Sequence, residues 1–140
     1  FPVAMGSDRG IAELRLGNLQ PGSAETSAGD IVKNWSLQYR IFSMCLDDLI
    51  PFAGAKYAVK IDFDGLELDI IRGGKKLLSS SNCRTVMIEN DSGNSERRHE
   101  IESLLVDSGF ELAREEVSDL MASKSQSETV NQIWTKDLAR

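Results

Sequence analysis

Two apolar segments on either side of a helix-length stretch constrain the fold of this chain more than any other feature. The segments "YAVKIDF" (57–63) and "RTVMIEN" (84–90) are nearly continuous apolar runs, a pattern typical of strands buried on both faces of a parallel sheet. Between them, apolar residues recur at helical spacing: Leu66, Ile70, Ile71, Leu77 and Leu78. A strand, a helix and a strand in this order predict a right-handed crossover and an α/β fold with a parallel sheet.

The rest of the C-terminal part continues this alternation. The segment "SERRHEIESLLVDSG" (95–109) predicts a capped helix that ends at Gly109. The apolar residues of this helix are expected to face inward: Ile101, Leu104 and Leu105. Two further strands are predicted at 110–115 and 131–138, with loop or a short helix between them.

The N-terminal part has a different pattern. Alternating residues around Val3 and Met5 predict a short strand, and the segment 11–17 predicts a second strand that forms a hairpin with it. Glycine, serine and proline are frequent from 18 to 34, which predicts a mobile surface loop.

Two elements are expected between this loop and the first apolar segment. Alternation at Trp35, Leu37, Tyr39 and Ile41 predicts a strand with one buried face. The segment 45–54 predicts a short helical turn that stops near Pro51. We expect all 140 residues to form one domain.

Composition argues against several classes of function. The net charge of -6 disfavours broad, charge-driven binding to nucleic acid or to an anionic membrane. No apolar run reaches the length of a transmembrane helix, and no signal-peptide pattern is present. Cys45 and Cys83 are too far apart for a metal motif and predict reduced, buried thiols, so we expect a cytoplasmic protein.

Acidic residues gather where the two apolar strands end. Asp62 and Asp64 follow the first strand, and Glu89 and Asn90 end the second. Ligands of open parallel sheets bind beyond the carboxyl ends of the strands, so these four side chains are expected to line one crevice. Asp62 interrupts an apolar strand at this point, which favours a functional role.

Structural roles are open for the neighbouring polar residues. Asp64 and Glu67 have the spacing of a helix capping box, and either residue could instead belong to a site. Asp69 is expected to face water. Lys60 is costly to bury without a partner, so it pairs with a carboxylate, reaches solvent, or contacts a substrate.

The segment "IDFDG" (61–65) resembles the first motif of haloacid-dehalogenase-like phosphatases, which is an apolar strand followed by Asp-x-Asp-Gly-Thr. That resemblance implies that Asp62 is a nucleophile and Asp64 a general acid. Leu66 stands where that family has threonine, and three predicted strands precede the motif.

A longer resemblance covers residues 45–112. The stretch "VKIDFDGLELDIIRGGKKLL", followed by "TVMIEN", resembles the FkbM family of S-adenosylmethionine-dependent methyltransferases. The family pattern is matched at these positions: Lys60, Ile61, Asp62, Asp64, Gly65, Glu67, Ile70, Ile71, Gly73 and Glu89. "MCLDDLIP" and "DSGFEL" resemble flanking elements of the family. Asp64 replaces the more common glutamate.

The FkbM resemblance implies a Rossmann-like methyltransferase fold, mostly parallel with one late antiparallel strand. It implies methylation of a hydroxyl on a small molecule or sugar, with S-adenosylmethionine as methyl donor. Asp62 would lie near donor and acceptor and would orient or deprotonate the acceptor, and a carboxyl group in such a cluster can have a raised pKa. Glu67 would be a second catalytic candidate. The expected substrate contacts are Lys60, Asp64, Glu89 and Asn90, and no metal-ligand set is defined.

The donor-binding features of that family are not found in these 140 residues. No glycine-rich turn joins a strand to a helix, and by resemblance the first glycine of "GGKK" marks packing. Phe1 aligns near the third strand of the family domain, so we expect the chain to be its C-terminal portion. The alternatives are the phosphatase and a non-catalytic module that forms a homodimer through an exposed sheet edge.

Overall fold

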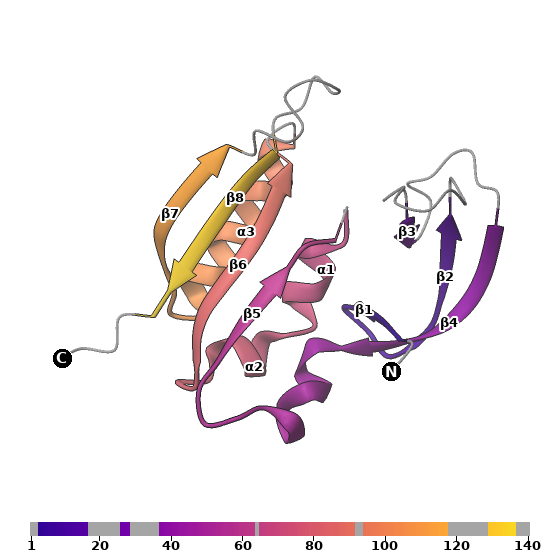
Figure 1. The fold of residues 1–140 in the computed structure, drawn as a ribbon, viewed down its shortest axis with the longest axis horizontal. Helices are drawn as coiled ribbons and strands as arrows, with labels where there is room; N and C mark the ends of the chain where they lie inside the picture. The colour runs from indigo at the N-terminus through magenta and orange to yellow at the C-terminus, as the bar shows by residue number, and fades with distance from the viewer. Residues whose placement is uncertain are drawn as a thin grey trace.

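The computed structural model describes residues 3–16, 26–28, 37–63, 65–91, 94–117 and 129–136. They form two four-stranded sheets, with the strand orders β1-β4-β2-β3 and β5-β6-β8-β7 (Figure 1). The strands are β1 (Ala4–Gly6), β2 (Gly10–Leu16), β3 (Thr26–Ala28), β4 (Leu37–Cys45), β5 (Tyr57–Ile61), β6 (Cys83–Asp91), β7 (Glu111–Val117) and β8 (Thr129–Thr135). The helices are the 3-10 helix η1 (Leu46–Phe52) and the α-helices α1 (Glu67–Arg72), α2 (Lys75–Ser79) and α3 (Ser95–Asp107). The α/β class is therefore confirmed.

The second sheet contains the four strands that the C-terminal pattern predicts. β5 and β6 are parallel, with Val59 beside Val86 and Ile61 beside Ile88. β8 runs antiparallel to β6, and β7 runs antiparallel to β8. The sheet is therefore mixed, with a parallel pair at one edge and an antiparallel pair at the other.

Helices cover one face of this sheet, and α3 lies behind it in Figure 1. The core between helices and sheet is apolar and includes Ile71, Leu78, Val86, Ile88, Ile101, Leu105, Phe110 and Trp134. On β5, however, Ala58 and Lys60 are exposed. The prediction that this strand is buried on both faces is wrong, because only the helix side of β5 is covered.

The third helix follows the prediction. Asn94 is its N-cap, and the side-chain oxygen of Asn94 accepts a hydrogen bond from the Arg97 backbone N–H at 3.1 Å. Ile101 and Leu105 are buried. Gly109 follows the helix with φ 88°, the left-handed conformation that favours glycine at this position.

The predicted first helix is divided into α1 and α2 at Gly73 and Gly74. A Cβ atom on Gly73 would overlap the backbone oxygen of Gly6, and one on Gly74 would meet the Leu46 side chain. The two glycines thus allow β1 and η1 to approach the helices closely. The packing role implied for Gly73 agrees with this geometry.

The N-terminal sheet corrects two predictions. β1 and β2 form no hairpin, because β4 lies between them, parallel to β1 and antiparallel to β2. The Ser43 hydroxyl donates to the Asp8 carbonyl at 3.0 Å, so the turn after β1 packs on β4 instead. The predicted buried face of β4 is also wrong, since Leu37 and Tyr39 are exposed where β2 and β4 extend away from the helices (Figure 1).

Three predictions concern residues that are described only in part. Within the predicted loop at 18–34, Thr26–Ala28 is the strand β3, paired with β2, and the rest lies outside the described residues. Trp35 and most of the segment between β7 and β8 also lie outside them. No helix in the described part of the chain is both long and apolar enough to cross a bilayer.

Candidate functional site

The structure brings Lys60, Asp62 and Glu89 together at the carboxyl ends of β5 and β6. Lys60 is paired with Met87, and Asp62 directly follows β5. Lys60 Nζ donates to Asp62 Oδ2 at 2.6 Å, and both side chains are about half exposed, at 60% and 47%. The lysine thus pairs with a carboxylate at the open face of the sheet.

The pKa values show that all three charged groups interact. The pKa of Asp62 is lowered, first by the hydrogen bond from Lys60 and second by the carboxyl group of Glu89. The pKa of Lys60 is raised by Asp62 and, to a lesser degree, by the charge of Glu89. Asp62 is therefore ionised at neutral pH, and it is not the carboxyl group with a raised pKa that the acidic cluster led us to expect.

Glu67 lies beside this cluster in sequence but is buried. Its Oε1 accepts from the Gly65 backbone N–H at 3.1 Å, and its Oε2 accepts from Arg97 Nη2 at 2.8 Å. These bonds join the loop after β5 to α3. The N-cap of α1 is Leu66, which makes no side-chain cap bond, and Asp64 lies outside the described residues.

Asn90 is separated from the other predicted site residues. Successive side chains of a strand point to opposite faces, so Asn90 points away from the face of Glu89. It is buried, and its Nδ2 donates to Gln132 Oε1 at 2.8 Å. This corrects the expectation that Asn90 lines the same crevice as Asp62.

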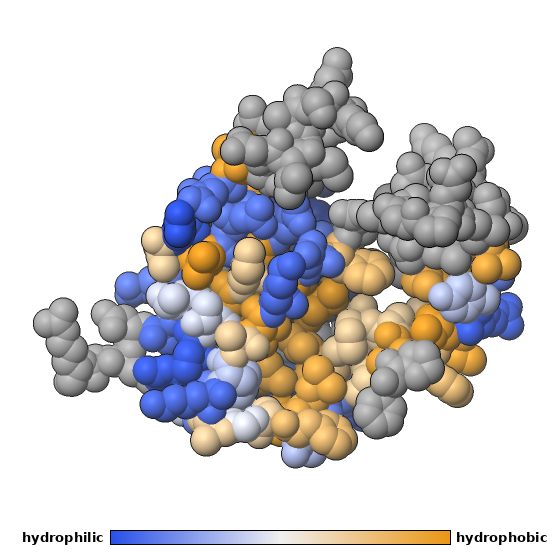
Figure 2. Space-filling model, viewed as in Figure 1, coloured by the Kyte–Doolittle hydropathy of each residue, from blue (hydrophilic) through white to orange (hydrophobic). Residues whose placement is uncertain are grey.

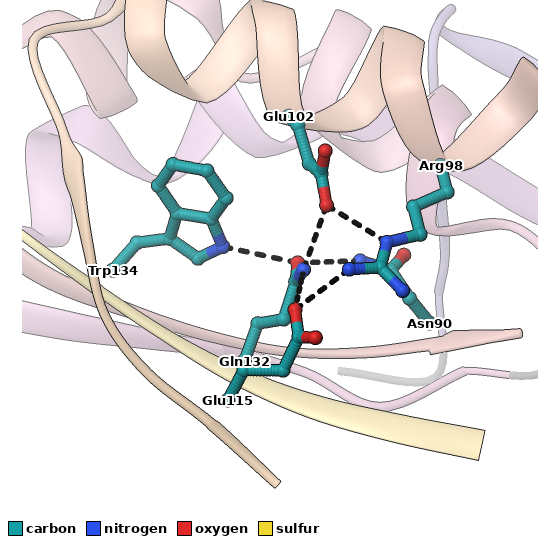
Figure 3. Close-up of polar contacts among 6 residues, drawn as sticks. All are labelled: Asn90, Arg98, Glu102, Glu115, Gln132 and Trp134. Atoms are coloured by element: carbon teal, nitrogen blue, oxygen red, sulfur yellow. Dashed lines mark hydrogen bonds and ion pairs between the residues drawn. The ribbon is translucent and has the colours of Figure 1, made fainter. Parts of the chain in front are cut away.

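The partner of Asn90 belongs to a buried polar network that the sequence analysis missed (Figure 3). Gln132 Oε1 accepts from Asn90 and, at 3.2 Å, from Trp134 Nε1. Gln132 Nε2 donates to Glu102 at 2.8 Å and to Glu115 at 2.7 Å. The signals in the sequence were a glutamine inside a predicted strand and the i, i+4 spacing of Arg98 and Glu102.

A groove of about 580 Å³ runs along β5 next to Lys60 and Asp62. Its remaining lining is mostly apolar and comes from β1, η1, α1, α2 and β5: Val3, Ala4, Met5, Leu46, Leu49, Phe52, Ala53, Tyr57, Ala58, Val59, Ile61, Phe63, Ile70 and Leu77. Figure 2 shows apolar side chains gathered over this part of the surface. The charged pair therefore stands beside an apolar groove.

Both cysteines lie in the described part of the chain. Cys45 and Cys83 are both free, and burial raises the pKa of each thiol. Cys83 is buried as expected, whereas Cys45 is half-buried. Within the described ranges, no three histidine, cysteine or acidic side chains are grouped so that they could hold a metal ion.

Comparison with known proteins adds no relative: no family model, curated protein or solved structure matches the chain.

Proposed function

We propose that this chain forms the acceptor side of an S-adenosylmethionine-dependent methyltransferase that methylates a hydroxyl group. The observation that carries the proposal is the position of Asp62, paired with Lys60 and close to Glu89, at the carboxyl end of β5. These residues belong to the segment that resembles the FkbM family. A parallel β5–β6 pair followed by the antiparallel β8 also agrees with the sheet expected from that resemblance.

In this proposal Asp62 orients the acceptor. An ionised carboxylate accepts a hydrogen bond from a hydroxyl group and can hold its oxygen in line with the methyl group. A lowered pKa makes Asp62 a weak base, so its role is orientation rather than early proton removal. Lys60 is a positioning residue that fixes the charge and direction of Asp62, and Glu67 positions the adjoining loop.

The described residues do not form a complete binding site for the methyl donor, S-adenosylmethionine. When bound, S-adenosylmethionine supplies the methyl group, and a Rossmann-type fold holds such a cofactor at a glycine-rich strand-to-helix turn. The 140 residues contain no such turn. Gly73 and Gly74 instead lie in close contact with Gly6 and Leu46, respectively. The proposal therefore covers acceptor orientation alone and assigns no donor contact to these residues.

A second candidate is a non-catalytic binding module. It is favoured by the position of β5 at the edge of its sheet, beside an apolar groove. Strand edges offer unpaired backbone groups to another chain. This candidate requires neither a donor nor Asp62.

Titration with S-adenosylhomocysteine, followed by calorimetry, tests the proposal first. One-to-one binding, together with transfer of a labelled methyl group from S-adenosylmethionine to a hydroxyl acceptor, would support it. Transfer should be lost in Asp62→Ala and kept in Asp69→Asn, which changes a half-exposed carboxylate on α1. The methyltransferase proposal fails if the protein expressed from its complete coding sequence does not bind S-adenosylhomocysteine and has no glycine-rich turn.

A different result would favour the phosphatase. That result is magnesium-dependent hydrolysis of p-nitrophenyl phosphate that is abolished by Asp62→Asn.

A further inference from the structure

We propose that Asp62 and Glu89 act as a carboxyl pair that accepts the proton of an acceptor hydroxyl group, with Glu89 as the final holder of that proton. This inference deepens the proposed function and rests on it for the source of the proton, whereas the pair itself can be tested without any methyl transfer. The site requires such a group, because a hydroxyl group that reacts at its oxygen must release its proton and Asp62 alone is a weak base.

The register of the sheet places the two carboxyl groups side by side. Ile61 of β5 is paired with Ile88 of β6 in the parallel ladder, so the residues that follow them, Asp62 and Glu89, lie next to each other. Ile61 and Ile88 are buried, and strand alternation therefore directs the two acidic side chains to the open face. Glu89 is half-buried there, and the Asp62 side chain is 47% exposed. Both carboxyl groups can thus exchange protons with solvent or with a bound ligand.

A hydrogen bond joins the two carboxyl groups. The side chain of Asp62 is hydrogen-bonded to Glu89 as well as to Lys60. Ionised carboxylates can only accept hydrogen bonds, so a bond between two carboxyl groups requires a proton on one of them. Asp62 and Glu89 therefore titrate as a pair and hold one proton between them until the pH is high enough to remove it.

Lys60 determines which member of the pair carries that proton. Its Nζ donates to Asp62 Oδ2 at 2.6 Å, and this hydrogen bond lowers the pKa of Asp62 more than the bond to Glu89 does. Asp62 is thus held as the carboxylate, and Glu89 is the donor in the bond between the two. A carboxyl group beside another that is already ionised keeps its proton to a higher pH than an isolated one. Once ionised, Glu89 is therefore the stronger base of the pair.

The other charged groups described on this face lie further along the ladder. On the β8 side, Glu89 is in register with the uncharged Asn131, and Asn131 is in register with Glu116 of β7. Glu116 forms an ion pair with Arg114. Among the described side chains of the open face, the charged groups next to Glu89 are therefore the two at the end of β5, and the titration of Glu89 reports on them.

The direction of proton transfer follows from these charges. When both members of the pair are ionised, two negative charges stand side by side at the end of an apolar groove, and Lys60 offsets only one of them. A proton that reaches Asp62 from a bound hydroxyl group relieves the repulsion, and it moves on to Glu89 because Lys60 favours the ionised form of Asp62. The O–H bond of the ligand breaks, an O–H bond on Glu89 forms, and the pair loses one negative charge. Glu89 acts through Asp62 and need not touch the ligand.

Carbon-detected NMR titration of the Asp62 and Glu89 carboxyl groups tests the pair directly. We expect Glu89 to titrate about one pH unit above the ordinary value of about 4.3, and the Asp62 signal should respond at the same pH because the proton is shared. Asp62→Asn should return the Glu89 midpoint to about 4.3. Glu116→Gln changes a 58% exposed carboxylate on β7 and should leave that midpoint unchanged. The pair is overturned if Glu89 titrates at its ordinary pH in the wild type, or if Asp62→Asn does not move its midpoint.

A second experiment separates this inference from the proposed function. In the protein expressed from its complete coding sequence, Glu89→Gln should slow methyl transfer about ten-fold or more. It should also move the acid limb of the pH profile to lower pH, because the limb then reports Asp62. Slower transfer with an unchanged limb would overturn the role of Glu89 as proton holder. No transfer at all, together with the expected Glu89 titration, would refute the proposed function while the pair stands. Transfer with an ordinary Glu89 titration would refute the pair alone.

Discussion

Gln132 donates a hydrogen bond from Nε2 to Glu102 Oε1 at 2.8 Å, and this bond joins the buried amide of β8 to α3. Arg98 strengthens the connection, because its Nε donates to Glu102 at 2.8 Å and its Nη2 donates to Glu115 at 2.7 Å. Gln132 itself is 0% exposed. One side chain therefore links β6, β7, β8 and α3.

Replacement of Gln132 by leucine should destabilise the protein by about 3 kcal/mol. The change leaves the amide of Asn90, the indole N–H of Trp134 and two carboxylates without their bonds to Gln132, and unsatisfied buried groups are costly. Urea unfolding measures the loss. Gln38→Leu on β4 is the matched control, since Gln38 is only half-buried and should change the free energy of unfolding by less than about 0.5 kcal/mol. Equal effects of the two changes would contradict the role of the network.

The same network predicts how stability depends on pH. Burial acts to raise the pKa of Glu102, but hydrogen bonds from Arg98 and Gln132 outweigh burial, so the pKa is lowered. A carboxyl group with a lowered pKa in the folded state stabilises the protein above its unfolded pKa of about 4.3. That contribution is lost as the pH falls through the folded pKa. Urea unfolding from pH 7 to pH 3 should show a steeper loss for wild type than for Glu102→Gln, and parallel curves would contradict the prediction.

The sequence predicted the second sheet well because its signals are local. The apolar runs at 57–63 and 84–90 and the capped helix at 95–109 specify their own secondary structure, and β5, β6 and α3 form there. The first sheet was predicted less well. Its pairing depends on whether β4 enters between β1 and β2, and short alternating segments do not encode that order.

Similar limits apply to the site. Lys60 and Asp62 are close in sequence and lie on one face by strand alternation, so their meeting could be predicted. The same alternation places Asn90 on the face opposite to Glu89, which a precise strand register would have revealed. Gln132 and Glu115 come from strands whose pairing is not visible in the sequence. A buried polar network between such strands cannot be recognised before the strand order is known.

Replacement of Gly73 by alanine should destabilise the protein by about 2 kcal/mol, because the added methyl group would overlap the backbone of Gly6. Either β1 or the end of α1 must then move. Gly10→Ala is the control, since a Cβ at Gly10 has nothing within 4 Å. Thermal unfolding compares the two variants. If Gly73→Ala were as stable as Gly10→Ala, the close packing of β1 on α1 would be refuted.

Replacement of Lys60 by methionine should raise the pKa of Asp62. The hydrogen bond from Lys60 is the largest cause of the lowered pKa, and methionine keeps most of the apolar stem without the charge. Carbon-detected NMR titration of the Asp62 carboxyl group measures the change, with Lys75→Met as control. The free energy of unfolding should change by less than about 1 kcal/mol, because the pair is exposed. If Asp62 orients an acceptor hydroxyl, Lys60→Met should also shift the acidic limb of any methyl transfer towards higher pH. An unchanged Asp62 titration would show that Lys60 does not control its charge.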